Sequence, residues 1–121
     1  IRKRRESRAV IVDAATQAQQ AGTITASELQ SIKLATRSPR MLSRMEDLII
    51  EKAQASGSYS FALDANGEPI KALIEWDKIA DFILKIAPLI FKLIEMFTFI
   101  SPAFDGSLAS FLDSDLSLSA C

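Results

Sequence analysis

The chain has 121 residues, of which 49% are hydrophobic and 24% are charged, and its formal net charge is −1. This length suits one domain with a modest core, and the composition is that of a folded chain. The sequence contains no His and a single Cys, Cys121. It therefore lacks the commonest general base and metal ligand, and it cannot form an intrachain disulfide. We expect a reducing compartment or an assembled particle, and no metal or cofactor.

The small net charge hides an uneven distribution along the chain. Residues 1–52 hold ten Lys and Arg against six Asp and Glu, whereas residues 53–121 hold four Lys against nine Asp and Glu. Such polarity favours head-to-tail contact between copies, or an anionic partner at the basic end. Ordinary surface charge is the alternative interpretation.

The most basic segment is residues 1–8, IRKRRESR, which we assign to an N-terminal arm. Bases at the start of a helix oppose the helix dipole, which favours an external anionic partner for them, whereas a solvated arm is the alternative. Phosphate-rich surfaces, either lipid head groups or nucleic acid, are the natural partners. No apolar run of about 7–15 residues follows the arm, so we predict no signal peptide. The candidate contacts with an anionic partner are Arg2, Lys3, Arg4, Arg5 and Arg8.

Three short amphipathic helices are predicted in the first half of a single helical domain, which we place at residues 9–102. Apolar residues recur at helical spacing over about 7–21, 26–36 and 39–55. Ala14 and Ala18 share the inner face of the first helix, where small side chains allow another helix to approach closely. Ser38 followed by Pro39 predicts the start of the third helix.

The turn between the first two helices partly resembles the second half of an EF-hand loop, with Gly22 and Glu28 at matching positions. The earlier ligand positions of that loop hold glutamine and alanine, and calcium needs several anionic oxygens. We therefore predict no calcium site. Gly22 instead predicts a helix C-cap, and Thr25 with Glu28 predicts a capping box that begins the second helix.

A short β-hairpin is predicted near residues 59–71. Apolar and small residues alternate over Tyr59–Leu63, and Asn66-Gly67 is a strong hairpin-turn signal. Pro69 cannot donate to a strand ladder, so the returning strand suits only an edge.

Residues 73–100 have the pattern of one long, highly apolar helix with a narrow polar stripe from Asp77 to Glu95. Pro88 lies in the stripe, and we expect it to be tolerated because the carbonyl of Leu84 that it frees would face water. The apolar arc is wider than packing on one core requires. It fits a central helix covered by the other three, a helix shared between core and oligomer interface, or a helix in or across a membrane.

The candidate contacts with a partner or with lipid lie on this arc: Phe82, Ile86, Leu89, Ile90, Phe91, Leu93, Phe97 and Phe99. Residues 103–121 form a tail rich in Ser, Leu and Asp. This tail is interpreted either as flexible or as an arm that docks on a neighbour.

The motifs of catalysis are missing from the sequence. There is no Gly-rich phosphate loop or nucleophile elbow, and no His that would activate a Ser. We therefore predict a non-enzymatic structural or assembly subunit of a larger oligomeric complex, with a virion-like particle as the favoured context. Its partners would be copies of itself or other subunits, with no small-molecule substrate.

Two other functions are alternatives to assembly. One is a protein of the membrane interface, or one that perturbs membranes, using the basic arm and the amphipathic helix 73–100 on an anionic lipid surface. The other is nucleic-acid binding, for which Tyr59 and Trp76 are the only aromatic residues with a polar group.

Overall fold

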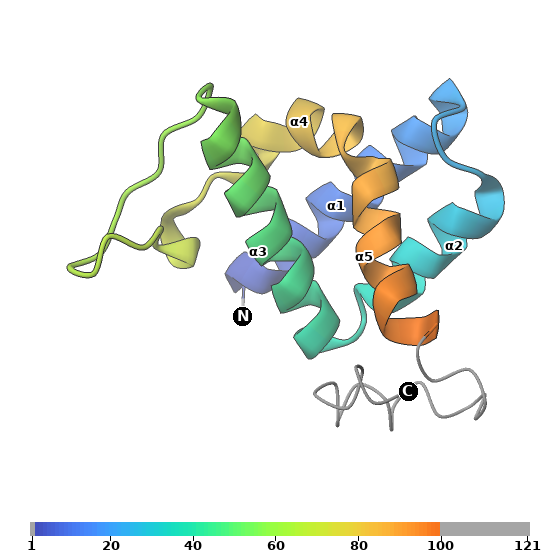
Figure 1. The fold of residues 1–121 in the computed structure, drawn as a ribbon, viewed down its shortest axis with the longest axis horizontal. Helices are drawn as coiled ribbons and strands as arrows, with labels where there is room; N and C mark the ends of the chain where they lie inside the picture. Colours follow the sequence, from blue (N-terminus) through green and yellow to red (C-terminus); the bar gives the residue numbers. More distant parts are fainter. Residues whose placement is uncertain (1, 100–121) are drawn as a thin grey trace.

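The computed structural model describes the backbone of residues 2–99 and the side chains of residues 6–97 (Figure 1). The predicted tail, the side chain of Phe99 and those of Arg2–Arg5 lie outside this description. The described residues form helices and no strand, so the prediction of a mainly helical bundle is confirmed. In chain order the helices are α1 (Arg2–Ala21), α2 (Ala26–Ala35), α3 (Pro39–Ser56), the 3₁₀ helices η1 (Lys71–Leu73) and η2 (Trp76–Ile79), α4 (Ala80–Lys85) and α5 (Ala87–Phe99).

Helix α1, and not the apolar stretch near the C-terminal end, is the element around which the bundle is arranged. It packs against α2, α4, α5 and η2, and Figure 1 shows it passing behind α5. Ala14, Ala15 and Ala18 are each at most 2% exposed. Their small side chains let the neighbouring helices approach the α1 backbone closely, as the sequence predicted.

The first helix begins earlier than the pattern indicates. Residues 2–8, which we assigned to an arm, form the first turns of α1. Arg, Lys and Glu are good helix formers, and their intrinsic propensity outweighs the unfavourable position of the bases at the N-terminus.

The local signals that join the first three helices behave as predicted. Gly22 adopts φ +86°, and the amide of Thr23 then donates to the carbonyl of Ala18 at 2.9 Å, which closes α1. Thr25 Oγ1 accepts from the amide of Glu28 at 3.0 Å, while the Thr25 amide donates to the Glu28 carboxylate at 2.8 Å. This capping box begins α2.

Helix α3 also has the predicted ends. Ser38 caps it by accepting from the amide of Met41 at 3.2 Å, and Pro39 occupies its first turn. Gly57 closes it in the left-handed region with φ +76°.

The predicted hairpin is reduced to a turn. The described residues contain a single antiparallel bridge between Leu63 and Pro69, and no strand. Asp64 Oδ1 accepts from the amides of Asn66 and Glu68 at 2.8 and 3.0 Å, which shapes the turn. The ladder stops there because Pro69 has no amide hydrogen and no third strand supports the pair.

The long apolar helix predicted for residues 73–100 is wrong. The segment contains η1, η2, the short helix α4, a break at Ile86 and then α5. Pro88 explains the break, because its ring would clash with the carbonyl of Leu84 and its nitrogen cannot donate to it. Figure 1 shows the consequence: α4 crosses the top of the bundle and α5 descends from it.

The core lies between α1 and the later helices. Its buried side chains include Ile11, Ile32, Met45, Ile49, Trp76, Ile83, Ile90 and Ile94. Trp76 is only 1% exposed, so the irregular segment between α3 and α4 is anchored by the largest side chain in the core. The bend at Ile86 thus lets α4 and α5 bury apolar side chains that one straight helix would expose.

Candidate interaction surfaces

The candidate contacts on the apolar arc face mainly into the protein. Ile90 and Phe97 are 1% and 6% exposed and belong to the core. Four more of them are partly buried: Phe82, Ile86, Phe91 and Leu93. Leu89, at 38%, is the exposed member of the set among the described side chains.

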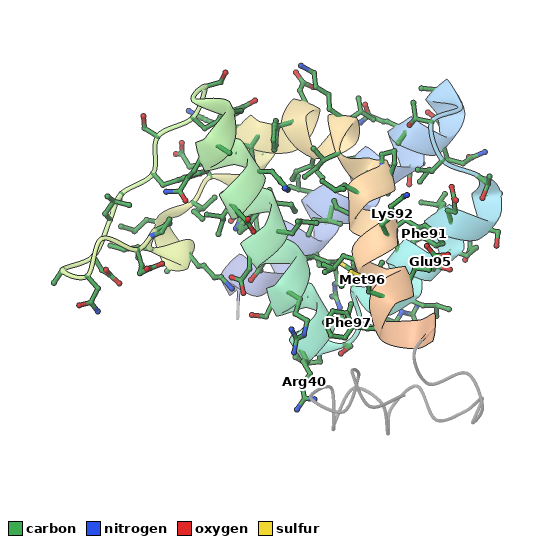
Figure 2. The ribbon with its side chains drawn as sticks, viewed as in Figure 1. Arg40, Phe91, Lys92, Glu95, Met96 and Phe97 are labelled. Atoms are coloured by element: carbon green, nitrogen blue, oxygen red, sulfur yellow. The ribbon has the colours of Figure 1, made fainter. Side chains whose placement is uncertain are left out.

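Figure 2 shows how α5 divides its side chains between its neighbours. Phe97 lies on the side of α3, where the guanidinium carbon of Arg44 is 4.4 Å from its ring centre. Phe91 and Glu95 lie on the side of α2. Met96, which the sequence analysis did not select, is 57% exposed. Helix α5 is therefore mostly covered by its own chain, and Leu89 and Met96 are the exposed large hydrophobic residues among its described side chains.

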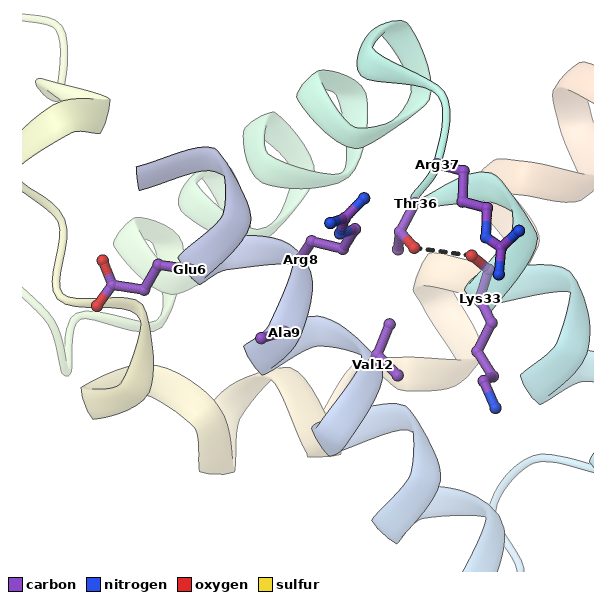
Figure 3. Close-up of a pocket in the computed structure, with 7 residues that line it drawn as sticks. All are labelled: Glu6, Arg8, Ala9, Val12, Lys33, Thr36 and Arg37. Atoms are coloured by element: carbon purple, nitrogen blue, oxygen red, sulfur yellow. Dashed lines mark hydrogen bonds between the residues drawn. The ribbon is translucent and has the colours of Figure 1, made fainter. Parts of the chain in front are cut away.

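A basic hollow lies between the first turns of α1 and the last turn of α2 (Figure 3). Its volume is about 940 Å³. The lining residues are Glu6, Arg8, Ala9, Val12, Lys33, Thr36 and Arg37. Three cations against one carboxylate give it a net charge of +2, and Glu6 points away from the three cations in Figure 3.

The three cations of the basic hollow are exposed and have no ion pair within the described part of the chain. Ala9 and the half-buried Val12 give the hollow an apolar wall. Thr36 is not available to a ligand as a donor, because its hydroxyl donates to the carbonyl of Lys33 at 2.7 Å. The hollow is thus a shallow apolar surface rimmed by exposed positive charges, which suits an anionic group with an apolar neighbour.

Sequence reasoning found Arg8 but missed Lys33 and Arg37. These two lie four positions apart and share one face of α2 and its C-terminal turn, which is a visible pattern. Basic side chains at a helix C-terminus interact favourably with the helix dipole, so local helix stability already explains these two residues. The sequence alone therefore gives no reason to assign them to a binding site. Only the packing of α1 on α2 brings them beside Arg8.

The other predicted anionic-partner contacts, Arg2–Arg5, occupy the first turns of α1 next to this hollow in the chain. The first turn of α1 contains no acidic residue to offset them. The backbone thus places four further bases at the same end of the bundle.

A polar cluster with a buried centre links three segments far apart in the chain. Ser7 Oγ, which is 0% exposed, donates to Oε2 of Glu46 at 2.6 Å. Lys71 Nζ lies 3.4 Å from Oε1 of Glu46 and 2.8 Å from Oδ1 of Asp47, and it donates to Ser43 Oγ at 3.1 Å. Because Ser7 is closed to solvent, its hydroxyl cannot reach a substrate, and the cluster serves to fix α1 and η1 on α3.

An acidic hollow adjoins this cluster and shares Asp47 and Lys71 with it. Its volume is about 550 Å³. The lining residues are Asp47, Ile50, Glu51, Gln54, Glu68, Pro69 and Lys71. Three carboxylates against one ammonium give it a net charge of −2. The turn at Leu63–Pro69 borders it and projects from the helices at the left of Figure 1.

Tyr59 and Trp76 are not placed for base stacking. Trp76 is buried in the core, and the half-buried Tyr59 packs edge-on against Phe82 with ring centres 5.6 Å apart. Base stacking requires an exposed ring face, which neither residue offers here.

The described residues contain no group of three or more His, Cys, Asp or Glu side chains that could hold a metal ion. None of the helices described for residues 2–99 is long and apolar enough to cross a bilayer. No protein-family model, curated protein or solved structure matches this chain.

Proposed function

We propose that this protein is a non-enzymatic assembly subunit that docks on an acidic protein surface through its basic end. The observation that carries the proposal is the basic hollow, where Arg8, Lys33 and Arg37 come together without internal counter-ions among the described residues. A large particle such as a virion is the context that we propose for such a subunit.

The energetics of α1 support an external partner for this end. Each base in the first turn of a helix costs roughly 0.3–1 kcal/mol through the helix dipole, and like charges close together repel further. The chain places Arg2–Arg5 there with no acid in the first turn, and adds the cations of the basic hollow. An acidic partner would relieve both costs on binding.

A protein surface suits this end better than lipid or nucleic acid. Insertion into lipid needs an exposed apolar face, but α5 turns most of its apolar side chains inward and leaves Leu89 and Met96 at the surface. Nucleic-acid binding commonly uses exposed aromatic rings that stack on bases, and among residues 6–97 no aromatic side chain is exposed. The apolar wall formed by Ala9 and Val12 is the kind of surface that a protein side chain covers.

The test is binding of fluorescently labelled polyglutamate to the full chain, followed by anisotropy at low and high salt. The variant combines Arg8→Gln, Lys33→Gln and Arg37→Gln, which removes three positive charges and keeps the side chains polar. We expect it to weaken binding at least tenfold. We also expect the affinity of the parent chain to fall steeply with salt.

The matched control removes the same charge elsewhere through Lys78→Gln, Lys85→Gln and Lys92→Gln, all at exposed positions. We expect this control to bind nearly as tightly as the parent chain. Equal losses in both variants would show that only net charge matters and would overturn the proposed site. Binding to phosphatidylserine vesicles or to single-stranded DNA, with none to polyglutamate, would overturn the choice of a protein partner.

A further inference from the structure

We infer that the acidic partner is a second copy of this chain, whose projecting turn at Leu63–Pro69 enters the basic hollow. This inference rests on the proposed function and names the partner of the same site. The two surfaces are carried by one polypeptide, so identical copies would join head to tail.

Charge complementarity is the first argument. The basic hollow carries a net charge of +2 and the acidic hollow beside the turn carries −2. Glu68 lies on both the turn and the acidic hollow, and it is exposed and has no ion pair among the described residues. Opposite charge of equal size on two separate surfaces steers copies into one relative orientation.

Shape and apolar exposure are the second argument. The turn is convex and stands clear of the helices in Figure 1, whereas the basic hollow is concave. Leu63 in the turn is 53% exposed, so it offers apolar surface to a partner. A carboxylate beside an exposed leucine matches a hollow that has cations at its rim and Ala9 and Val12 on its wall.

The positions of the two surfaces determine the form of the assembly. The basic hollow is built from α1 and α2, and the acidic surface from α3 and the turn, with no residue in common. Each copy therefore keeps one free surface after a contact forms. Such heterologous contacts build a ring if the rotation closes and an open filament if it does not.

The strength of each contact is modest. Exposed ion pairs stabilise a contact weakly, and salt screens them over about 8–10 Å at moderate ionic strength. We expect self-association that strengthens at low salt and weakens at high salt. The overall affinity becomes high only when many copies are joined, because each copy is then held by several contacts.

Charge reversal tests the pairing directly by sedimentation velocity. The first variant, Arg8→Glu with Arg37→Glu, makes both surfaces negative. The second, Glu51→Lys with Glu68→Lys, makes both positive. We expect each variant alone to lose self-association at least tenfold, and an equimolar mixture to regain it because the copies can then alternate.

A matched control, Lys85→Glu with Lys92→Glu, changes the charge as much as the first variant at exposed positions outside both hollows. It should associate like the parent chain, and circular dichroism checks that every variant is folded. A monomeric parent chain that still binds polyglutamate would overturn the head-to-tail contact and leave the proposed function standing. A mixture that stays monomeric while the parent chain associates would place the interface elsewhere.

Discussion

Replacing Ser7 by Ala tests whether the buried contact between α1 and α3 positions the basic end. The hydroxyl of Ser7 donates to Glu46 across 2.6 Å, with the two residues 0% and 3% exposed. A hydrogen bond to a buried charged acceptor is worth about 1.5–3 kcal/mol, because water cannot replace the lost donor. We therefore expect Ser7→Ala to lower the free energy of unfolding by about 2 kcal/mol.

This loss is a large share of the roughly 5–15 kcal/mol that stabilises a domain, and it should lower the melting temperature by about 8 °C. Urea unfolding followed by circular dichroism measures it. Ser60→Ala, in an exposed part of the same chain, is the control and should change stability by less than about 0.5 kcal/mol.

A double-mutant cycle with Glu46→Gln separates the contact from the loss of a hydroxyl. We expect a coupling free energy of about 1–2 kcal/mol between the two changes. A Ser7→Ala variant as stable as the Ser60→Ala control, with effects that simply add to Glu46→Gln, would refute the assignment of Ser7 and Glu46 as a buried pair.

Three further predictions concern the fold. Ile90→Ala should lower the free energy of unfolding by about 2–5 kcal/mol, and Leu89→Ala by less than about 1 kcal/mol, because Ile90 is 1% exposed and Leu89 is 38% exposed. Equal losses in chemical unfolding would contradict the orientation of α5 that the bend before it produces. Thr25→Ala should lower the free energy of unfolding by about 0.5–2 kcal/mol because the capping box is lost. If both the stability and the circular dichroism signal at 222 nm stay unchanged, the capping box does not stabilise α2. Gly57→Ala should cost about 1 kcal/mol because φ is +76° there, and a stabilised variant in thermal unfolding would show that the left-handed cap is absent.

Much of the fold follows from short-range signals in the sequence. Ser38 with Pro39, and Thr25 with Glu28, act within one helical turn, so their effect does not depend on distant packing. The small residues on α1 likewise indicate a face that another helix approaches.

The errors arise where tertiary contacts decide the outcome. The apolar pattern after residue 73 is continuous in sequence, and the break near Pro88 is favourable because the bend buries Ile83 and Ile90 in one core. The hairpin fails because its strands find no third partner, which a local Asn-Gly signal cannot report.

The candidate site shows the same limit. Arg8 is visible as a base in a basic segment, but its partners in the hollow lie on α2 and in the turn after it, 25 and 29 positions later in the chain. Ser7 and Glu46 are separated by 39 positions, and neither residue type suggests the pair on its own. Charge polarity along the sequence favours head-to-tail contact between copies or an anionic partner at the basic end, whereas the location of the hollow comes from the packing of α1 on α2.

The most direct test of the central claim is the mass of the full chain in solution as a function of salt. Sedimentation velocity between about 0.01 M and 1 M salt spans Debye lengths from about 30 Å to 3 Å. If the basic hollow holds the acidic turn of another copy, the weight-average mass falls steadily as salt rises. A mass that stays constant contradicts the head-to-tail contact. A mass that grows with salt also contradicts it, because salt would then strengthen apolar association through side chains such as Leu89 and Met96.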